Sequence, residues 1–218
     1  MSSDSVNAPD GAAAPKYFYP NRIGRIILQS METVFGKDRL EEVLLAGGLG
    51  HINKPLPPGN LDKRFPFEYV GGLMAAIEKV YGERAGRAMQ ARVGRTAFGS
   101  GLKEFDPLLG IADLPLRLMP LGMKFRVGLD VFQRVFNQFS DQVVRLSDDD
   151  RHLLWIIERC PVCWGRHTED ACCHLALGIL EEAIFWGTGG KRFAIEEYAC
   201  VARGDATCSF KIDRQPID

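Results

Sequence analysis

The hydrophobic pattern of this chain changes period near residue 140, and that change constrains the fold more than any other feature. Before it, apolar residues recur at the three- and four-residue spacing of amphipathic helices, as in Ile23–Phe35 and Lys124–Phe139. After it, short apolar runs such as His152–Arg159 are bounded by turn residues, which is typical of strands. We therefore predict an α+β fold in which a helical N-terminal two thirds packs on a small antiparallel sheet.

Charge and hydropathy argue against two classes of partner. The chain has 27 basic and 28 acidic residues, a formal net charge of −1, whereas nucleic-acid-binding proteins usually carry a basic surplus. We therefore expect no nucleic-acid partner. No run of 18 apolar residues occurs, so no transmembrane segment is expected. Residues 1–15 lack the basic and apolar regions of a secretory signal, and a cytoplasmic location is expected.

All six cysteines follow residue 159: Cys160, Cys163, Cys172, Cys173, Cys200 and Cys208. The thiols of a cytoplasmic protein are kept reduced, so a disulfide framework is not expected. Clustered cysteines in such a protein more often bind a metal or perform redox chemistry. Some of them could instead be small buried hydrophobic residues.

The strongest local motif is Glu197-x-x-Cys200 followed by Cys208. The two cysteines bracket a Gly-Asp turn between predicted strands 193–201 and 207–212, so their sulfurs can converge on one ion. Glu197 would point to the opposite face of a flat strand, and only a bulge or the strand end would turn it inward.

A tetrahedral zinc site needs further ligands, and two sources compete for the role. Cys173 is expected in the first turn of a helix over 170–186, where the helix N-terminus favours a thiolate. The Cys160-x-x-Cys163 pair at the end of the preceding strand is the rival.

A stripe of large apolar residues indicates either plain core or a pocket between helices and sheet. Methionine and aromatic linings suit flat or flexible hydrophobic ligands. The expected lining residues are Met119, Met123, Phe125, Phe132, Phe136, Trp155 and Trp186. We find no acid–base pair, nucleophile elbow or dinucleotide-binding loop, and therefore predict no catalytic residue.

The C-terminal stretch resembles the 4-vinyl reductase domain family. The resemblance is carried by Cys173-x4-Gly178, Glu197-x-x-Cys200, Gly204-Asp205 and Cys208-x-Phe210. That family is associated with bacteriochlorophyll biosynthesis and is related to the sensor domains of phenol-responsive activators, which are built like transport-particle subunits and are often dimeric. The resemblance implies a structural zinc ion on Cys173, Glu197, Cys200 and Cys208, and makes Cys160 and Cys163 alternates.

With this resemblance, residues 1–19 are expected to be a disordered tail and residues 20–218 a single ligand-binding domain. Its 20–140 part is mainly helical, and its 141–218 part is a zinc-bearing sheet with an inserted helix. The expected function is a homodimeric small-molecule-binding protein for a hydrophobic or aromatic ligand, such as a tetrapyrrole, that assists bacteriochlorophyll biosynthesis.

Two alternatives remain open. One is a tetrapyrrole vinyl reductase or iron–sulfur protein, with a cluster on Cys160, Cys163 and two further cysteines. The other is a protein-interaction scaffold or regulator. A non-enzymatic role is favoured, because no nicotinamide or flavin motif supplies electrons.

Overall fold

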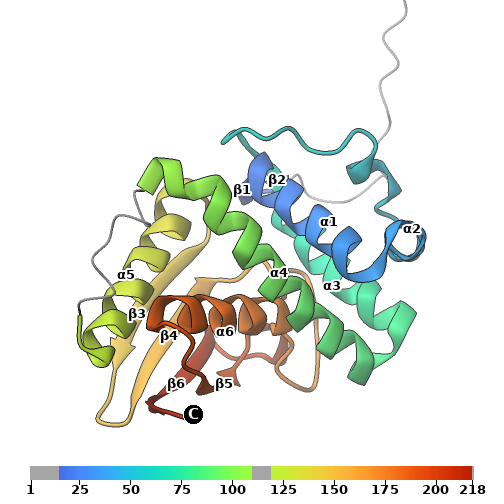
Figure 1. The fold of residues 1–218 in the computed structure, drawn as a ribbon. Helices are drawn as coiled ribbons and strands as arrows, with labels where there is room; N and C mark the ends of the chain where they lie inside the picture. The colour runs from blue at the N-terminus through green and yellow to red at the C-terminus, as the bar shows by residue number, and fades with distance from the viewer. Residues whose placement is uncertain (1–14, 110–118, 218) are drawn as a thin grey trace, which may run out of the picture.

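Figure 1 shows the computed structural model of the chain, which describes residues 15–109 and 119–217. Within these residues the α-helices are α1 Asn21–Phe35, α2 Lys37–Ala46, α3 Phe67–Tyr81, α4 Glu83–Leu109, α5 Leu121–Phe139 and α6 His174–Thr188. The strands are β1 Phe18–Pro20, β2 Lys63–Pro66, β3 Val143–Asp148, β4 His152–Arg159, β5 Phe193–Ala199 and β6 Cys208–Pro216. Short 3₁₀ turns lie at η1 Gly50–Asn53 and η3 Val201–Arg203.

The last four strands form one antiparallel sheet in the order β3-β4-β6-β5. Trp155 on β4 pairs with Phe210 on β6, and both side chains are almost fully buried. Because directly paired residues lie on the same face of a sheet, they mark the face that meets the helices. On the edge strand β5, by contrast, Ala194, Glu196 and Tyr198 are exposed in alternation.

The helices form two groups on either side of α4, as Figure 1 shows. Helices α5 and α6 cover the sheet, and α4 crosses over α6. On the far side of α4 lie α1, α2 and α3, with the two-stranded β1–β2 ladder at one end. None of the helices in the described ranges combines the length and apolar character needed to cross a lipid bilayer.

The predicted α+β class is confirmed, with a helical N-terminal two thirds and an antiparallel sheet after residue 140. Two elements differ from expectation. Helix α4 continues through Gly99 and Gly101, although glycine disfavours a helix interior, and α1, α3 and α6 pack against this helix. Strand β1, Phe18–Pro20, begins within the last residues of the segment 1–19 that was expected to be a tail, since its residues pair with β2. The first 14 residues of that segment lie outside the described residues.

Candidate functional site

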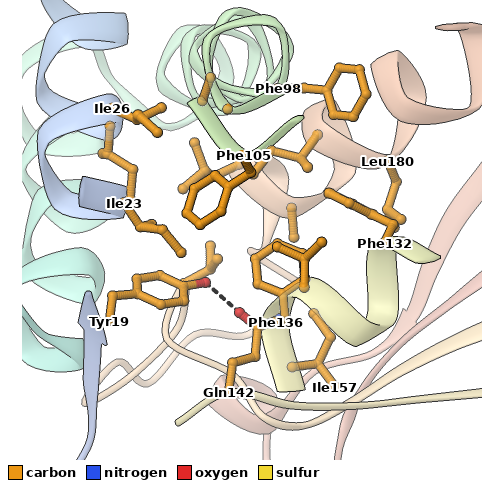
Figure 2. A pocket seen from close by; sticks show the side chains of 18 of the residues that line it. Tyr19, Ile23, Ile26, Phe98, Phe105, Phe132, Phe136, Gln142, Ile157 and Leu180 are labelled. Carbon is orange, nitrogen blue, oxygen red and sulfur yellow. Dashed lines mark hydrogen bonds between the residues drawn. The ribbon is translucent and has the colours of Figure 1, made fainter. Parts of the chain in front are cut away.

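An apolar cavity of about 110 Å³ lies where α1, α4, α5, α6 and the sheet meet. Figure 2 shows its aromatic walls: Tyr19 from β1, Phe98 and Phe105 from α4, and Phe132 and Phe136 from α5. Ile23, Ile26, Ile157 and Leu180 close the remaining sides. Among the described residues, no lining side chain carries a charge.

One polar pair lines this cavity. The Tyr19 hydroxyl donates a hydrogen bond to Gln142 Oε1, across 123 residues of sequence (Figure 2). Burial raises the pKa of Tyr19 well above its usual 10, and the neighbouring Cys160 and Cys173 raise it further, so the phenol stays neutral. Gln142 is 4% exposed, so its side-chain amide is buried at this wall of the cavity.

The residues predicted to line a pocket lie in several places. Phe132, Phe136 and Trp155 line the cavity. Phe125 stacks on Phe193 with ring centroids 4.8 Å apart, away from the cavity. The remaining three predicted lining residues are outside it: Met119, which is half-buried, and the exposed Met123 and Trp186.

The six cysteines come together as one buried cluster beside this cavity. All are free thiols, and each is at most 3% exposed. The Sγ atoms of Cys160 and Cys173 are 3.5 Å apart, and those of Cys163 and Cys208 are 3.3 Å apart. The Sγ of Cys200 lies 4.0 Å from that of Cys208. The rival pairs considered from sequence therefore belong to the same cluster.

Local structure explains how Glu197 joins this cluster. The pairing of β5 with β6 is irregular between Glu197 and Ala199, the bulge that would be needed to turn the carboxylate inward. Glu197 Oε2 accepts a hydrogen bond of 2.8 Å from the backbone N–H of Cys173, which caps the start of α6. Glu197 Oε1 is buried without a partner among the described residues. Burial and the nearby Cys200 raise the pKa of Glu197 to about 8.

Comparison with known proteins identifies the fold but no sequence family. No protein family and no curated protein matches the chain. Among solved structures, an Fe(II) unliganded H-NOX (heme nitric oxide/oxygen binding) protein from K. algicida matches with a TM-score of 0.56 at 11% identity, over 91% of this chain and 97% of that one. An H-NOX protein from S. oneidensis in the Fe(II)NO ligation state matches with a TM-score of 0.54 at 11% identity, over 91% and 99%. A variant of the Tt H-NOX protein reaches 0.51 at 16% identity, over 91% and 97%. At such identities the matches establish a common fold alone.

These matches overturn the resemblance to the 4-vinyl reductase domain family. The expected role in bacteriochlorophyll biosynthesis is wrong on the same finding, and so are the structural zinc and the iron–sulfur cofactor. The proteins that share the fold are H-NOX proteins, and two of those above are described in Fe(II) states. The family prediction failed because it depended on a short cysteine motif near the C-terminus. Such a motif does not specify the helices and strands that precede it.

The cavity does not fit a haem. Haem iron in proteins is held by His, Cys, Met or Tyr. Among described residues, Tyr19 is the only one of these types that lines the cavity, and its neutral hydroxyl is engaged with Gln142. Residues 106–118 contain none of the four types, and residues 52–151 contain no histidine. A cavity of about 110 Å³ is in the size range that accepts one small ring, since an engineered cavity of roughly 150 Å³ binds benzene, and it is too small for a macrocycle of four rings.

Proposed function

We propose that this chain is a binding domain for a small, uncharged, largely apolar molecule, with a single aromatic ring as the best-fitting class. The cavity carries this proposal, because its volume of about 110 Å³ is close to that of an engineered protein cavity of roughly 150 Å³ that binds benzene. Its walls are rich in phenyl rings, which favour offset or edge-on contact with another ring.

The Tyr19–Gln142 pair supports a preference among such ligands. The Gln142 side chain is buried at one wall, where its amide N–H groups can donate to an oxygen on the ligand. A single polar contact in an apolar pocket fixes orientation and provides specificity. A hydroxylated or carbonyl-bearing ring is therefore expected to bind better than the bare hydrocarbon.

The shared fold supports only the general part of this proposal, that the chain binds a small molecule. A protein of the same fold from S. oneidensis is described with NO on Fe(II), so this architecture is compatible with binding a small molecule. A tetrapyrrole is too large for the cavity, which removes the basis for the vinyl reductase alternative. The open cavity also argues against a pure scaffold, for which a collapsed core is expected.

Two further expectations remain proposals. Residues 20–218 are proposed to act as one ligand-binding domain, and the protein is proposed to be a homodimer. Light scattering on the purified chain tests the second: a mass twice that of the 24.2 kDa chain is expected, and a monomer contradicts it.

The binding proposal is tested with benzene and phenol as probes. Each is expected to raise the melting temperature, since a ligand that binds only the folded state stabilises it by about 2.7 kcal/mol at a hundred times its Kd. Phenol is expected to bind more tightly than benzene. Calorimetric titration measures both affinities directly.

Ala97→Leu places a larger side chain in the cavity and is expected to abolish binding of both probes while the helical circular dichroism remains. Ala75→Leu is the matched control, because Ala75 is an exposed helical residue on α3 that does not line the cavity. Binding that survives Ala97→Leu, or no binding to the unaltered protein, refutes the proposal.

A further inference from the structure

Two consecutive pairs of residues join β1 to the segment that precedes β3. Tyr19 donates to Gln142 on the cavity wall, as Figure 2 shows. One residue earlier in each segment, Phe18 and Asp141 are bonded twice. The Phe18 N–H donates to Asp141 Oδ2 at 2.9 Å, and the Asp141 N–H donates to the Phe18 carbonyl oxygen at 3.1 Å.

The Asp141 carboxylate also binds the second strand of the β1–β2 ladder. Its Oδ1 accepts a hydrogen bond of 2.9 Å from Lys63 Nζ on β2, and the same ammonium group donates to the Ser140 carbonyl oxygen at 3.2 Å. Burial acts to raise the pKa of this carboxyl group, but the hydrogen bonds from Lys63 and Phe18 outweigh it and hold the pKa below the usual 3.8. The carboxylate is therefore ionised, and each of its oxygens binds a different strand of the ladder.

The main chain at residue 141 is held from the four-stranded sheet as well. Arg159, the last residue of β4, donates from Nη1 to the Asp141 carbonyl oxygen at 2.8 Å. Its guanidinium carbon lies 4.2 Å from the centroid of the Tyr17 ring, a cation–π contact with the residue that precedes β1. Contacts from β1, β2 and β4 therefore meet at Asp141.

The β1–β2 ladder by itself does not place Tyr19 against Gln142. Strand β1 has three residues and pairs with β2 in a separate two-stranded sheet, whereas Gln142 lies outside both strands. An isolated pair of strands is only marginally stable. Because a hydrogen bond weakens steeply with poor distance or angle, the Tyr19–Gln142 bond needs the two segments to be held in register.

We propose that Asp141 is a positioning residue for the cavity: by holding Phe18 and Lys63, it keeps the two polar side chains of the cavity wall together. This inference rests on the proposed function, because the Tyr19–Gln142 pair is what distinguishes one ring ligand from another. Asp141 does not line the cavity, so it acts on a ligand only through this pair. Its loss is therefore expected to change which ring binds best, and not whether a ring binds.

The experiment compares benzene and phenol on the full-length protein by calorimetric titration. One net hydrogen bond gives phenol an expected preference of about fivefold in the unaltered protein. Asp141→Ala is expected to remove most of this preference and to leave the Kd of benzene, which has no polar atom, nearly unchanged. Glu196→Ala is the matched control, because it breaks a lysine–carboxylate pair of 2.8 Å, to Lys211, at an exposed residue of β5. That variant should keep the full preference.

A ligand-free measurement separates this inference from the proposed function. Nuclear Overhauser contacts between the Tyr19 ring and the Gln142 side-chain amide are expected in the unaltered protein and in Glu196→Ala, and are expected to be lost in Asp141→Ala. If neither probe binds the unaltered protein, the proposed function fails and these contacts alone decide the role of Asp141. Contacts that persist in Asp141→Ala, or a phenol preference that survives in it, overturn the inference.

Asp141→Asn is measured instead if Asp141→Ala does not fold. The amide keeps one oxygen for the Phe18 N–H, but its NH₂ group cannot accept a hydrogen bond from Lys63. A reduced phenol preference with weakened contacts between Tyr19 and Gln142 is then expected. A preference and contacts equal to those of the unaltered protein refute the assignment.

Discussion

Asp149 shows how one side chain can organise a turn between two strands. Its Oδ1 accepts hydrogen bonds from the backbone N–H groups of Arg151, at 2.8 Å, and His152, at 2.7 Å. These backbone bonds, and a further contact with the His152 ring, lower the pKa of Asp149 to about 2. The ionised carboxylate is therefore favoured in the folded state over the unfolded state.

The pH dependence of stability follows from the direction of this shift. The contribution of Asp149 is complete above the unfolded pKa of about 4 and is lost as the pH falls through about 2. Asp149→Asn keeps an acceptor oxygen but does not titrate. Its deficit in melting temperature relative to the unaltered protein is therefore expected to shrink between about pH 4 and pH 2. The control Asp150→Asn changes an exposed neighbour with no hydrogen bond in the described chain, and a similar pH-dependent deficit there would contradict the assignment.

Particular residues of the cysteine cluster and of the cavity show which parts of each site could be predicted from the sequence. The turn between Cys200 and Cys208 indicated that these sulfurs could converge, and they lie 4.0 Å apart. Chain spacing did not reveal that Cys160 and Cys163 join the same cluster, because that depends on how the β4–α6 connection folds back. Tyr19 had no local signal at all, since its partner Gln142 is 123 residues away.

At the scale of elements, the apolar period predicted most helices and strands. Strand β4 was predicted with the bounds that the structure has, His152–Arg159, and the strand predicted over 193–201 begins where β5 begins, at Phe193. The failures were elements stabilised by tertiary contact. Strands β1 and β2 are short and pair across more than 40 residues, and α4 tolerates glycines because α1, α3 and α6 pack against it.

The crossing of α4 and α6 depends on glycine. A Cβ atom at Gly178 would overlap the carbonyl oxygen of Ala91, and one at Gly94 would overlap the carbonyl oxygen of Leu175. Gly178→Ala is therefore expected to destabilise the fold by about 1–3 kcal/mol, as measured by urea unfolding. The matched control is Gly187→Ala on the same helix, where a Cβ meets nothing within 4 Å. There the gain in helix propensity is expected to stabilise by up to about 1 kcal/mol. Equal effects of the two variants would contradict this packing account.

At the scale of the whole molecule, a shared fold does not carry a shared cofactor. The chain overlays H-NOX proteins across nine tenths of its length, yet its cavity is lined by phenyl rings and aliphatic side chains. A fold is maintained by the pattern of buried apolar residues, which many sequences satisfy, whereas a cofactor needs particular donor atoms. The described lining of this chain is apolar and offers no available donor to iron.

Mixing the protein with haemin tests whether the chain lacks the cofactor although it has the fold. The purified chain, mixed with haemin under reducing conditions and passed over a desalting column, is expected to elute without stoichiometric haem. An H-NOX protein treated identically serves as the positive control and should retain it. The physical reason is twofold: no imidazole, thiol or thioether lines the described cavity, and Tyr19 is held neutral with its hydroxyl bonded to Gln142. Nonspecific surface binding is recognised by its persistence in Ala97→Leu, which fills the cavity. Stoichiometric haem that is lost in Ala97→Leu would show that the cavity opens further and finds an iron ligand, and would overturn both the size argument and the proposed ligand class.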